Sequence, residues 1–291
     1  MRDLLSYLAL RIGVGLLGLL PVRAAQRVGT WGGLIFHRFA SGRRDMARRH
    51  MARVLGEGGD PRMAARRMFY WYGRYWGEAL WVRQRRIEEL RSRLTCEGLE
   101  YIEKAKADGK GMIFALPHMG NWEIAAPLAV ERDVAVVAVA EKLRNRHITS
   151  WFTAMRAEFG IEIVLATGTA EVMRRLDAAL AENKAVALLA DRDLRGRGPA
   201  VEFFGEETPL PQGPASLAVM TGAPLMAVGC YFDGVGHRAV VLPPLAVPAT
   251  GSRSERIRDL TQDLAHQMED LVRRAPEQWH LLQPNWPSDR G

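Results

Sequence analysis

His118 is followed five residues later by Glu123 in the stretch ALPHMGNWE, residues 115–123. An imidazole beside a carboxylate can act as a general base. The carboxylate accepts the Nδ1 proton, fixes the tautomer and stabilises the imidazolium that forms when Nε2 takes a proton from a hydroxyl. None of the other six histidines has an acid at that spacing. Roughly 0.8 such matches arise by chance with this composition, so the spacing has meaning only in its structural context.

That context is a junction between a strand and a helix. The apolar run GMIFAL, residues 111–116, indicates a buried strand, and NWEIAAPLAV, residues 121–130, indicates the helix that follows. Between them, Pro117 fixes the backbone and Gly120 permits a tight turn. Glu123 then falls in the first helical turn, where the helix dipole favours a carboxylate. We expect it to reach back to the imidazole.

The sequence offers no obvious covalent nucleophile. It has no G-x-S-x-G elbow, no Walker loop, no G-x-G-x-x-G after a strand and no H-E-x-x-H. Its two cysteines, Cys96 and Cys230, lie too far apart for a disulfide framework or a zinc site, which favours a reducing compartment. We therefore expect no metal and no bound cofactor, and direct attack by a substrate hydroxyl on an activated acyl donor.

Short apolar runs alternate with helical segments from about residue 97 onward. Besides the two segments above, strands are predicted at 133–139, 161–165, 184–190 and 224–232, and helices at 146–159, 170–183 and 253–274, the last opened by a capping box of Ser252 and Glu255. This rhythm predicts an α/β fold with an open, mostly parallel sheet layered by helices. Functional groups in such sheets gather at the carboxyl ends of the strands, where His118 is expected.

The basic charge lies entirely in the N-terminal third. Residues 1–93 carry 19 Lys and Arg against 7 Asp and Glu, a net +12, whereas residues 94–291 carry 21 against 26, a net −5. We divide the chain accordingly into a basic, aromatic-rich helical region, 1–93, and an α/β core, 94–291, on which that region packs. The basic region is either a solvated helical surface or a surface for anionic membranes. No recognition motif supports nucleic acid as a partner.

The first 22 residues are apolar, but Arg11 splits the stretch and Pro21 closes it, so it is too short to cross a bilayer. A secretory signal, a buried core helix and an interfacial helix all remain open. The interfacial helix is favoured because arginines could extend toward headgroups while leucines enter the acyl boundary. The aromatic stretch RRMFYWYGRYWGEALW, residues 66–81, is typical of core, although its rings also suit a membrane interface or a sugar-bearing headgroup.

Several ordered blocks carry a family resemblance: ALPHMGNWE, ADRDL, FFGEETPLPQGPASLAVMTGAPL and EQWHLLQPNW. Over residues 66–287 the sequence resembles the bacterial lysophospholipid-type acyltransferases that include the lipid A acyltransferases, and most closely the branch that acts on phosphatidylinositol mannosides. The resemblance implies an α/β fold with a groove. It also implies transfer of a fatty acyl chain, typically palmitoyl, from acyl-CoA to a mannose hydroxyl by an enzyme held peripherally on the cytoplasmic face of the inner membrane.

Carried onto this sequence, the resemblance makes His118 the general base and Glu123 its paired acid, and places Asp191 of ADRDL against the histidine. The mannoside branch has Asp at the position of Glu123. This difference affects the assignment of the acceptor more than that of the mechanism. An ion pair of Asp191 with Arg192 or Arg195 is the alternative reading.

The resemblance also places Glu141 and Arg156 along the groove. Arg156 and Arg192 are candidates to bind substrate phosphates, as are Lys142, Arg195 and Arg197. Asn121 is either a donor to the tetrahedral oxyanion or only a helix cap.

Two alternatives remain open at this point. The acceptor could be lipid A or another glycolipid. The chain could instead be a noncatalytic lipid-binding protein whose basic helices dock on anionic membranes.

Overall fold

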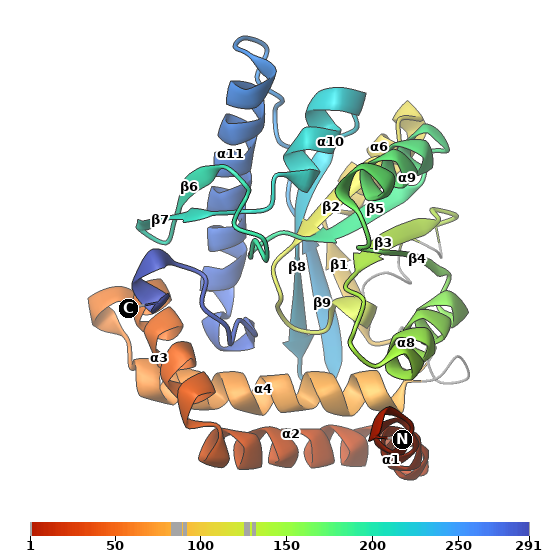
Figure 1. Ribbon diagram of the computed structural model, residues 1–291, viewed down its shortest axis with the longest axis vertical. Coiled ribbons are helices and arrows are strands. Elements are labelled where there is room, and N and C mark those ends of the chain that lie inside the picture. Colours follow the sequence, from red (N-terminus) through yellow and green to blue (C-terminus); the bar gives the residue numbers. More distant parts are fainter. Residues whose placement is uncertain (1, 83–88, 90–91, 125–128, 130–131, 291) are drawn as a thin grey trace.

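A seven-stranded sheet forms the centre of the molecule (Figure 1). The structure is a computed structural model that describes residues 2–82, 89, 92–124, 129 and 132–290. The strand order is β1-β9-β8-β2-β5-β3-β4, and every neighbouring pair is parallel except β8 with β9. The strands are β1 (Leu94–Glu97), β2 (Met112–Leu116), β3 (Val136–Ala140), β4 (Ile161–Leu165), β5 (Ala185–Leu189), β8 (Leu225–Asp233) and β9 (Gly236–Val241). A separate antiparallel pair is formed by β6 (Ala200–Phe203) and β7 (Glu206–Pro209). The predicted α/β class is confirmed.

Helices cover both faces and one end of this sheet. They are α1 (Arg2–Leu17), α2 (Val22–Phe39), α3 (Ser41–Leu55), α4 (Pro61–Trp81), α6 (Leu99–Asp108), α8 (Arg146–Glu158), α9 (Thr169–Ala181), α10 (Gly213–Thr221) and α11 (Arg253–Arg274), with short 3-10 turns η1 (Gly56–Gly58), η2 (Pro276–Gln278) and η3 (Pro287–Arg290). The predicted capping box at the start of α11 is present.

Two predicted elements, the strand from residue 133 and the helix at 121–130, differ from the structure or lie partly outside its described residues. The strand expected from residue 133 begins only at Val136, because Asp133 adopts a left-handed conformation with a φ of 55° that an extended strand does not accommodate. The helix expected at 121–130 is helical at residues 122–124, and most of its remainder, 125–128 and 130, lies outside the described residues.

The two faces of the sheet have different roles. On β2, Ile113 and Ala115 point into a core shared with α9, α10 and α11, whereas Phe114 and Leu116 point to the side of α6 and α8. The small side chain of Ala187 stands beside Phe114 in the register of β2 and β5. The second face is therefore the less completely filled one, and the cavity described below lies on it.

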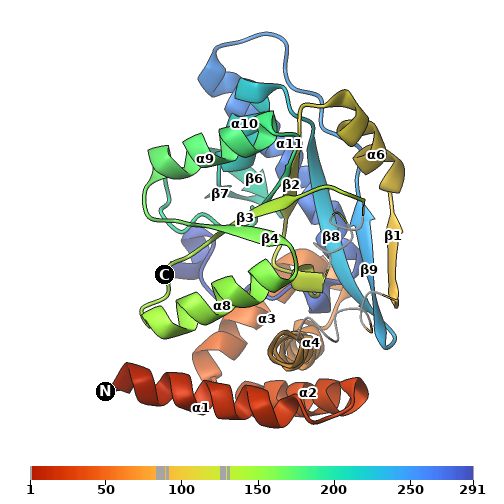
Figure 2. The ribbon, with the colours of Figure 1, turned by 90° about the vertical axis from the view of Figure 1, so that its right-hand side faces the viewer.

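The N-terminal helices form a layer at one end of the sheet. Figure 2 shows α1 and α2 on the far side of α4 from the strands. α2 and α4 pack backbone to backbone, because a Cβ atom placed on Gly33 would lie 2.8 Å from the Cα of Gly73. Helices α3 and α4 share a hydrophobic cluster with the sheet through side chains such as Met51 and Phe69. Phe69, Tyr75 and Trp81 are buried, and Trp71 and Tyr72 pack against core clusters, so five of the seven aromatic rings belong to the core. Tyr70 and Trp76 are exposed.

The outermost layer exposes large apolar side chains. On α1 and the turn after it these are Leu4, Leu5, Leu8, Ile12, Leu16 and Leu19, and on α2 they are Val28, Trp31, Ile35, Phe36 and Phe39. Of the three alternatives for the first helix, this exposure contradicts a buried core helix, although Val14 is fully buried on its inner side. None of the helices that the structure describes combines the length and hydropathy needed to span a bilayer.

Candidate active site

His118 lies just beyond the carboxyl end of β2, as the sequence predicts, and Asp191 lies against it, as the family resemblance implies. The His118 Nδ1 lies 2.6 Å from Asp191 Oδ1, and the backbone N–H of His118 donates to Asp191 Oδ2 at 2.9 Å. Asp191 follows β5, which pairs in parallel with β2 and places Leu189 beside Leu116. The ends of two adjacent parallel strands thus bring the imidazole and the carboxylate together.

Asp191 is fully buried, yet its environment favours the charged form. Trp279 Nε1 donates to Asp191 Oδ2 at 2.7 Å. Burial by itself would raise the pKa of Asp191, but the contacts with His118 and the hydrogen bond from Trp279 lower it below its usual value. Because the ionised carboxylate only accepts hydrogen bonds, we assign the proton of the neutral imidazole to Nδ1. Nε2 is then the basic atom, and it has no hydrogen-bond partner among the described residues.

The turn after His118 is held by the C-terminal segment. Gly120 has a φ of 57°, and a Cβ atom there would collide with the carbonyl of Cys230 on β8, so the position requires glycine. The N–H of Gly120 donates to the carbonyl of Gln278 at 2.9 Å, and the N–H of His280 donates to the carbonyl of His118 at 2.6 Å. The histidine is therefore presented by a rigid turn clamped from both sides.

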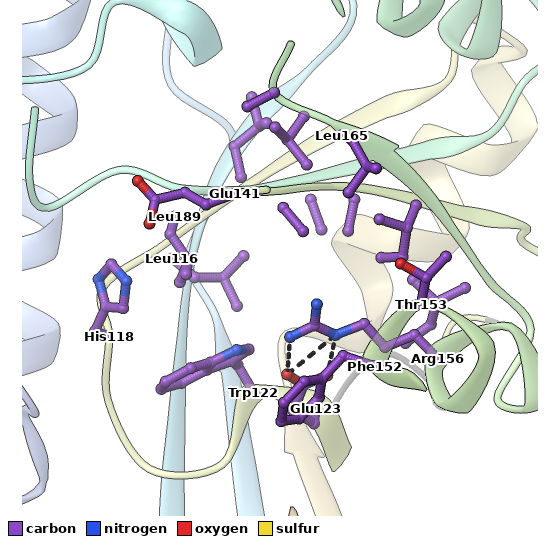
Figure 3. A pocket seen from close by; sticks show the side chains of 18 of the residues that line it. Leu116, His118, Trp122, Glu123, Glu141, Phe152, Thr153, Arg156, Leu165 and Leu189 are labelled. Carbon is purple, nitrogen blue, oxygen red and sulfur yellow. Dashed lines mark hydrogen bonds and ion pairs between the residues drawn. The ribbon is translucent and has the colours of Figure 1, made fainter. Parts of the chain in front are cut away.

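A cavity of about 450 Å³ opens in front of His118 (Figure 3). Its floor is the partly filled face of the sheet, made of apolar side chains from β2, β3, β4 and β5, among them Leu116, Ala138, Ile163, Ala187 and Leu189. Its walls come from α4 and α8, and its polar lining includes His118, Glu141 and Arg156. An apolar chain can lie along this floor while a polar group meets the histidine at one end.

The predicted pairing of Glu123 with His118 is wrong. Arg156 binds Glu123 instead, through Nε at 2.9 Å and Nη2 at 2.5 Å. The side chain of Trp122 packs edge-on against His118 with 5.6 Å between ring centroids, and Figure 3 shows it between the histidine and Glu123. Burial opposes the charge of Arg156, but the bonds to Glu123 raise its pKa above the usual value. The pair is a fixed, charged part of the cavity wall.

The expectation that Asn121 donates to an oxyanion is also not supported by its position. Asn121 is buried, does not line the cavity, and its Nδ2 donates to Glu78 Oε2 on α4 at 2.8 Å. Its side chain does not cap the following helix either, because its Oδ1 accepts no hydrogen bond from the described residues, whereas its backbone carbonyl accepts one from Ile124.

The other predicted positions separate into two groups. Glu141, Arg156 and Arg192 line the cavity. Burial and nearby cations lower the pKa of Arg192 from its usual value, against the opposing effect of Glu141 and Asp191.

The remaining three positions are exposed and do not line the cavity: Lys142, Arg195 and Arg197. Asp193 folds the loop that carries Arg195 and Arg197, because it accepts hydrogen bonds from the backbone N–H groups of both.

Sequence reasoning missed three functional contributors. Trp279 orients Asp191, while Tyr75 and Trp122 stack at 4.5 Å between ring centroids and form one wall of the cavity. Trp279 lies in the block EQWHLLQPNW, but nothing in its spacing indicates which side chain reaches the site. Among the described residues no cluster of three or more His, Cys, Asp or Glu side chains could hold a metal ion.

Comparisons with known proteins identify the family of this chain. The profile of a family described as bacterial lipid A biosynthesis acyltransferase matches residues 2–288. The phosphatidylinositol mannoside acyltransferase of Mycobacterium tuberculosis strain H37Rv is 36% identical over 253 residues, which cover 84% of this chain and 78% of that protein. The phosphatidylinositol mannoside acyltransferase of Mycolicibacterium smegmatis is 34% identical over 248 residues, covering 84% and 80%. This chain belongs to the bacterial lipid A biosynthesis acyltransferase family.

Proposed function

We propose that this acyltransferase moves a fatty acyl chain from acyl-CoA to a mannose hydroxyl of a phosphatidylinositol mannoside. The proposed chain is palmitoyl, and the proposed general base is His118. The observation that carries the proposal is the His118 and Asp191 pair at the end of an apolar cavity. The names of the mannoside-specific relatives support the acceptor. The acyl-CoA donor is inferred from the family resemblance.

The geometry suggests the following mechanism. The acceptor hydroxyl lies against His118 Nε2, which takes its proton while the oxygen attacks the thioester carbonyl. Asp191 holds the ring by its Nδ1 proton and offsets the positive charge that develops on it. The tetrahedral intermediate collapses, the bond from carbonyl carbon to sulfur breaks, and CoA leaves as a thiolate that recovers the proton from Nε2. The products are the acylated glycolipid and CoA.

The cavity suggests where each part of the substrates lies. The acyl chain lies on the apolar floor formed by strands β2 to β5, where its contacts are almost all with aliphatic side chains. Glu141 and the Glu123 and Arg156 pair line the cavity and offer hydrogen bonds to sugar hydroxyls, because charged groups that are already fixed in place make strong hydrogen bonds at little further entropic cost. Arg192 contributes positive charge for a substrate phosphate.

The exposed apolar side chains of α1 and α2 form the surface that we propose rests on the membrane. Arg11, Arg23 and Arg27 lie on the same two helices, so leucines and aromatic rings can enter the acyl boundary while arginines meet anionic headgroups. One wall of the cavity contacts this surface layer, because Asn145 at the start of α8 donates to the carbonyl of Asp3 on α1 at 2.7 Å. A lipid acceptor would then reach the site from the cytoplasmic face of the inner membrane.

The direct test of the reaction is a mass measurement. Purified protein incubated with palmitoyl-CoA and a panel of phosphatidylinositol mannosides and lipid A precursors should add one acyl group to a mannoside. A His118→Ala variant should lose activity by a factor of about 10³ or more without unfolding. If only lipid A precursors are acylated, lipid A replaces the mannoside as the acceptor. Release of CoA without acylated lipid would indicate a thioesterase. Full activity of a folded His118→Ala protein would refute the role of His118 as the base. Vesicle binding without acyl turnover on any acceptor would favour the noncatalytic alternative.

Trp279→Phe tests the contribution of the indole donor to Asp191. The substitution keeps the packed ring but removes the hydrogen bond, so kcat should fall about tenfold with little change in KM. Trp286→Phe is the matched control, because Trp286 is equally buried and its Nε1 donates to the carbonyl of Phe203 at 2.9 Å, away from Asp191. Steady-state kinetics and melting temperatures of both variants are compared. Equal kcat losses in the two variants would refute the specific role of Trp279.

Trp31→Glu tests the membrane surface. Trp31 is 67% exposed on α2, and replacing its ring by a negative charge should weaken binding to vesicles with anionic lipid by roughly tenfold or more. Met220→Glu is the control, since Met220 is 50% exposed on α10, which Figure 1 shows at the opposite end of the molecule. Vesicle sedimentation measures both. Unchanged binding of Trp31→Glu, or the same loss in both variants, would contradict the assignment.

A further inference from the structure

A second buried carboxylate lies behind the turn that presents His118. Glu78 on α4 is fully buried and accepts hydrogen bonds from four side chains. They are Gln26 Nε2 at 2.8 Å and Arg74 Nε at 2.8 Å on Oε1, and Asn121 Nδ2 at 2.8 Å and His237 Nε2 at 2.7 Å on Oε2. None of these groups lines the cavity, so the cluster is separate from the site that meets the substrates.

We propose that Glu78 is a positioning residue for acyl transfer: its carboxylate fixes Asn121 and, through Asn121, the turn that places His118 against the cavity. This inference rests on the proposed function. It assigns a role to a side chain that makes no contact with substrate and that belongs to the N-terminal helical region rather than to the sheet.

The four donors come from four separate parts of the chain. Gln26 belongs to α2, Arg74 to α4 itself, Asn121 to the turn after β2 and His237 to β9. Arg74 extends the cluster further, because its Nη1 donates to the carbonyl of Gly234 at 2.7 Å and its Nη2 to that of Gly236 at 3.1 Å. Glu78 therefore joins the N-terminal helices, the hairpin between β8 and β9, and the His118 turn at one point.

The charge of Glu78 is required for this arrangement. Burial would raise its pKa, but the interactions with His237 and Arg74 outweigh burial and lower the pKa to about 2. An ionised carboxylate offers about four acceptor positions and no donor, which matches the four donors that surround it. A neutral side chain of the same shape would leave buried donors without partners, a costly arrangement.

Asn121 transmits the constraint because of its place in the turn. It lies three residues after His118 and directly before Trp122, whose ring packs against the imidazole. Its Oδ1 is buried and has no hydrogen-bond partner among the described residues, so the bond to Glu78 is the one side-chain hydrogen bond that holds this residue. Without that bond, residues 120–122 lose their hydrogen bond to α4 and keep only the stacking of Trp122 on Tyr75. The imidazole is then held less firmly at its distance from the reacting groups.

Asn121→Ala and Gln26→Ala form a matched pair for the test. Each removes one amide donor to Glu78 at 2.8 Å, so both should lower the melting temperature by a similar amount. Only Asn121→Ala removes the hydrogen bond between the His118 turn and α4. We expect its kcat to fall about tenfold or more with KM little changed, while Gln26→Ala keeps the wild-type kcat.

A spectroscopic measurement on the protein without substrate separates positioning from direct contact with the reaction. The Nδ1 proton of His118, in its short hydrogen bond to Asp191, should give a strongly downfield proton resonance. It should shift or broaden in Asn121→Ala and stay in place in Gln26→Ala.

If the His118 Nδ1 proton resonance does not change in Asn121→Ala, the proposal is overturned, whatever the activity of that variant. Equal losses of kcat in both variants would also overturn it, since they would indicate general destabilisation. If the wild-type protein acylates no acceptor, the proposed function fails, and the resonance comparison still decides the role of Glu78.

Discussion

The structure depends on one hydrogen bond between a buried carboxylate and an imidazole at the edge of a cavity. Asp191 is fully shielded from water, which by itself disfavours its charge, and it stays ionised because three donors converge on it: the ring of His118, the backbone of His118 and the indole of Trp279. That charge assigns the imidazole proton to Nδ1 and leaves Nε2 free to take another. The bond therefore determines whether the site can act as a base.

Keeping this bond in place requires parts of the chain that are distant in sequence. The parallel pairing of β2 with β5 brings the two strand ends together. The C-terminal segment returns to clamp both partners: Trp279 and the side chain of Asn285 hold Asp191, while Gln278 and His280 hold the histidine turn. Rigid support from several elements is what a catalytic group needs if its position is to vary by less than an ångström. The same sheet thus supplies both parts of the site: its partly filled face forms the apolar floor, and its carboxyl edge positions His118.

Much of this could be predicted from the sequence, and the failures have physical causes. The buried strands, the α/β class and the place of His118 follow from apolar periodicity and from the rule that groups gather at strand ends. The partner of His118 could not be chosen by spacing, because Glu123 binds Arg156, which lies 33 residues further along the chain. The order of the strands was equally hidden, since β5 is adjacent to β2 only through the crossover that places β3 and β4 beyond it. Asn121 shows the same limit: its partner Glu78 belongs to the N-terminal helices.

The measurement that tests the central bond most directly is the activity of Asp191→Asn. The asparagine keeps the shape of the side chain, but its amide favours the other imidazole tautomer, in which Nδ1 accepts and Nε2 holds the proton. We predict a protein that folds and loses acyl transfer by a factor of about 10³ to 10⁴ in kcat. A folded Asp191→Asn protein with a kcat close to that of the wild type would contradict the account.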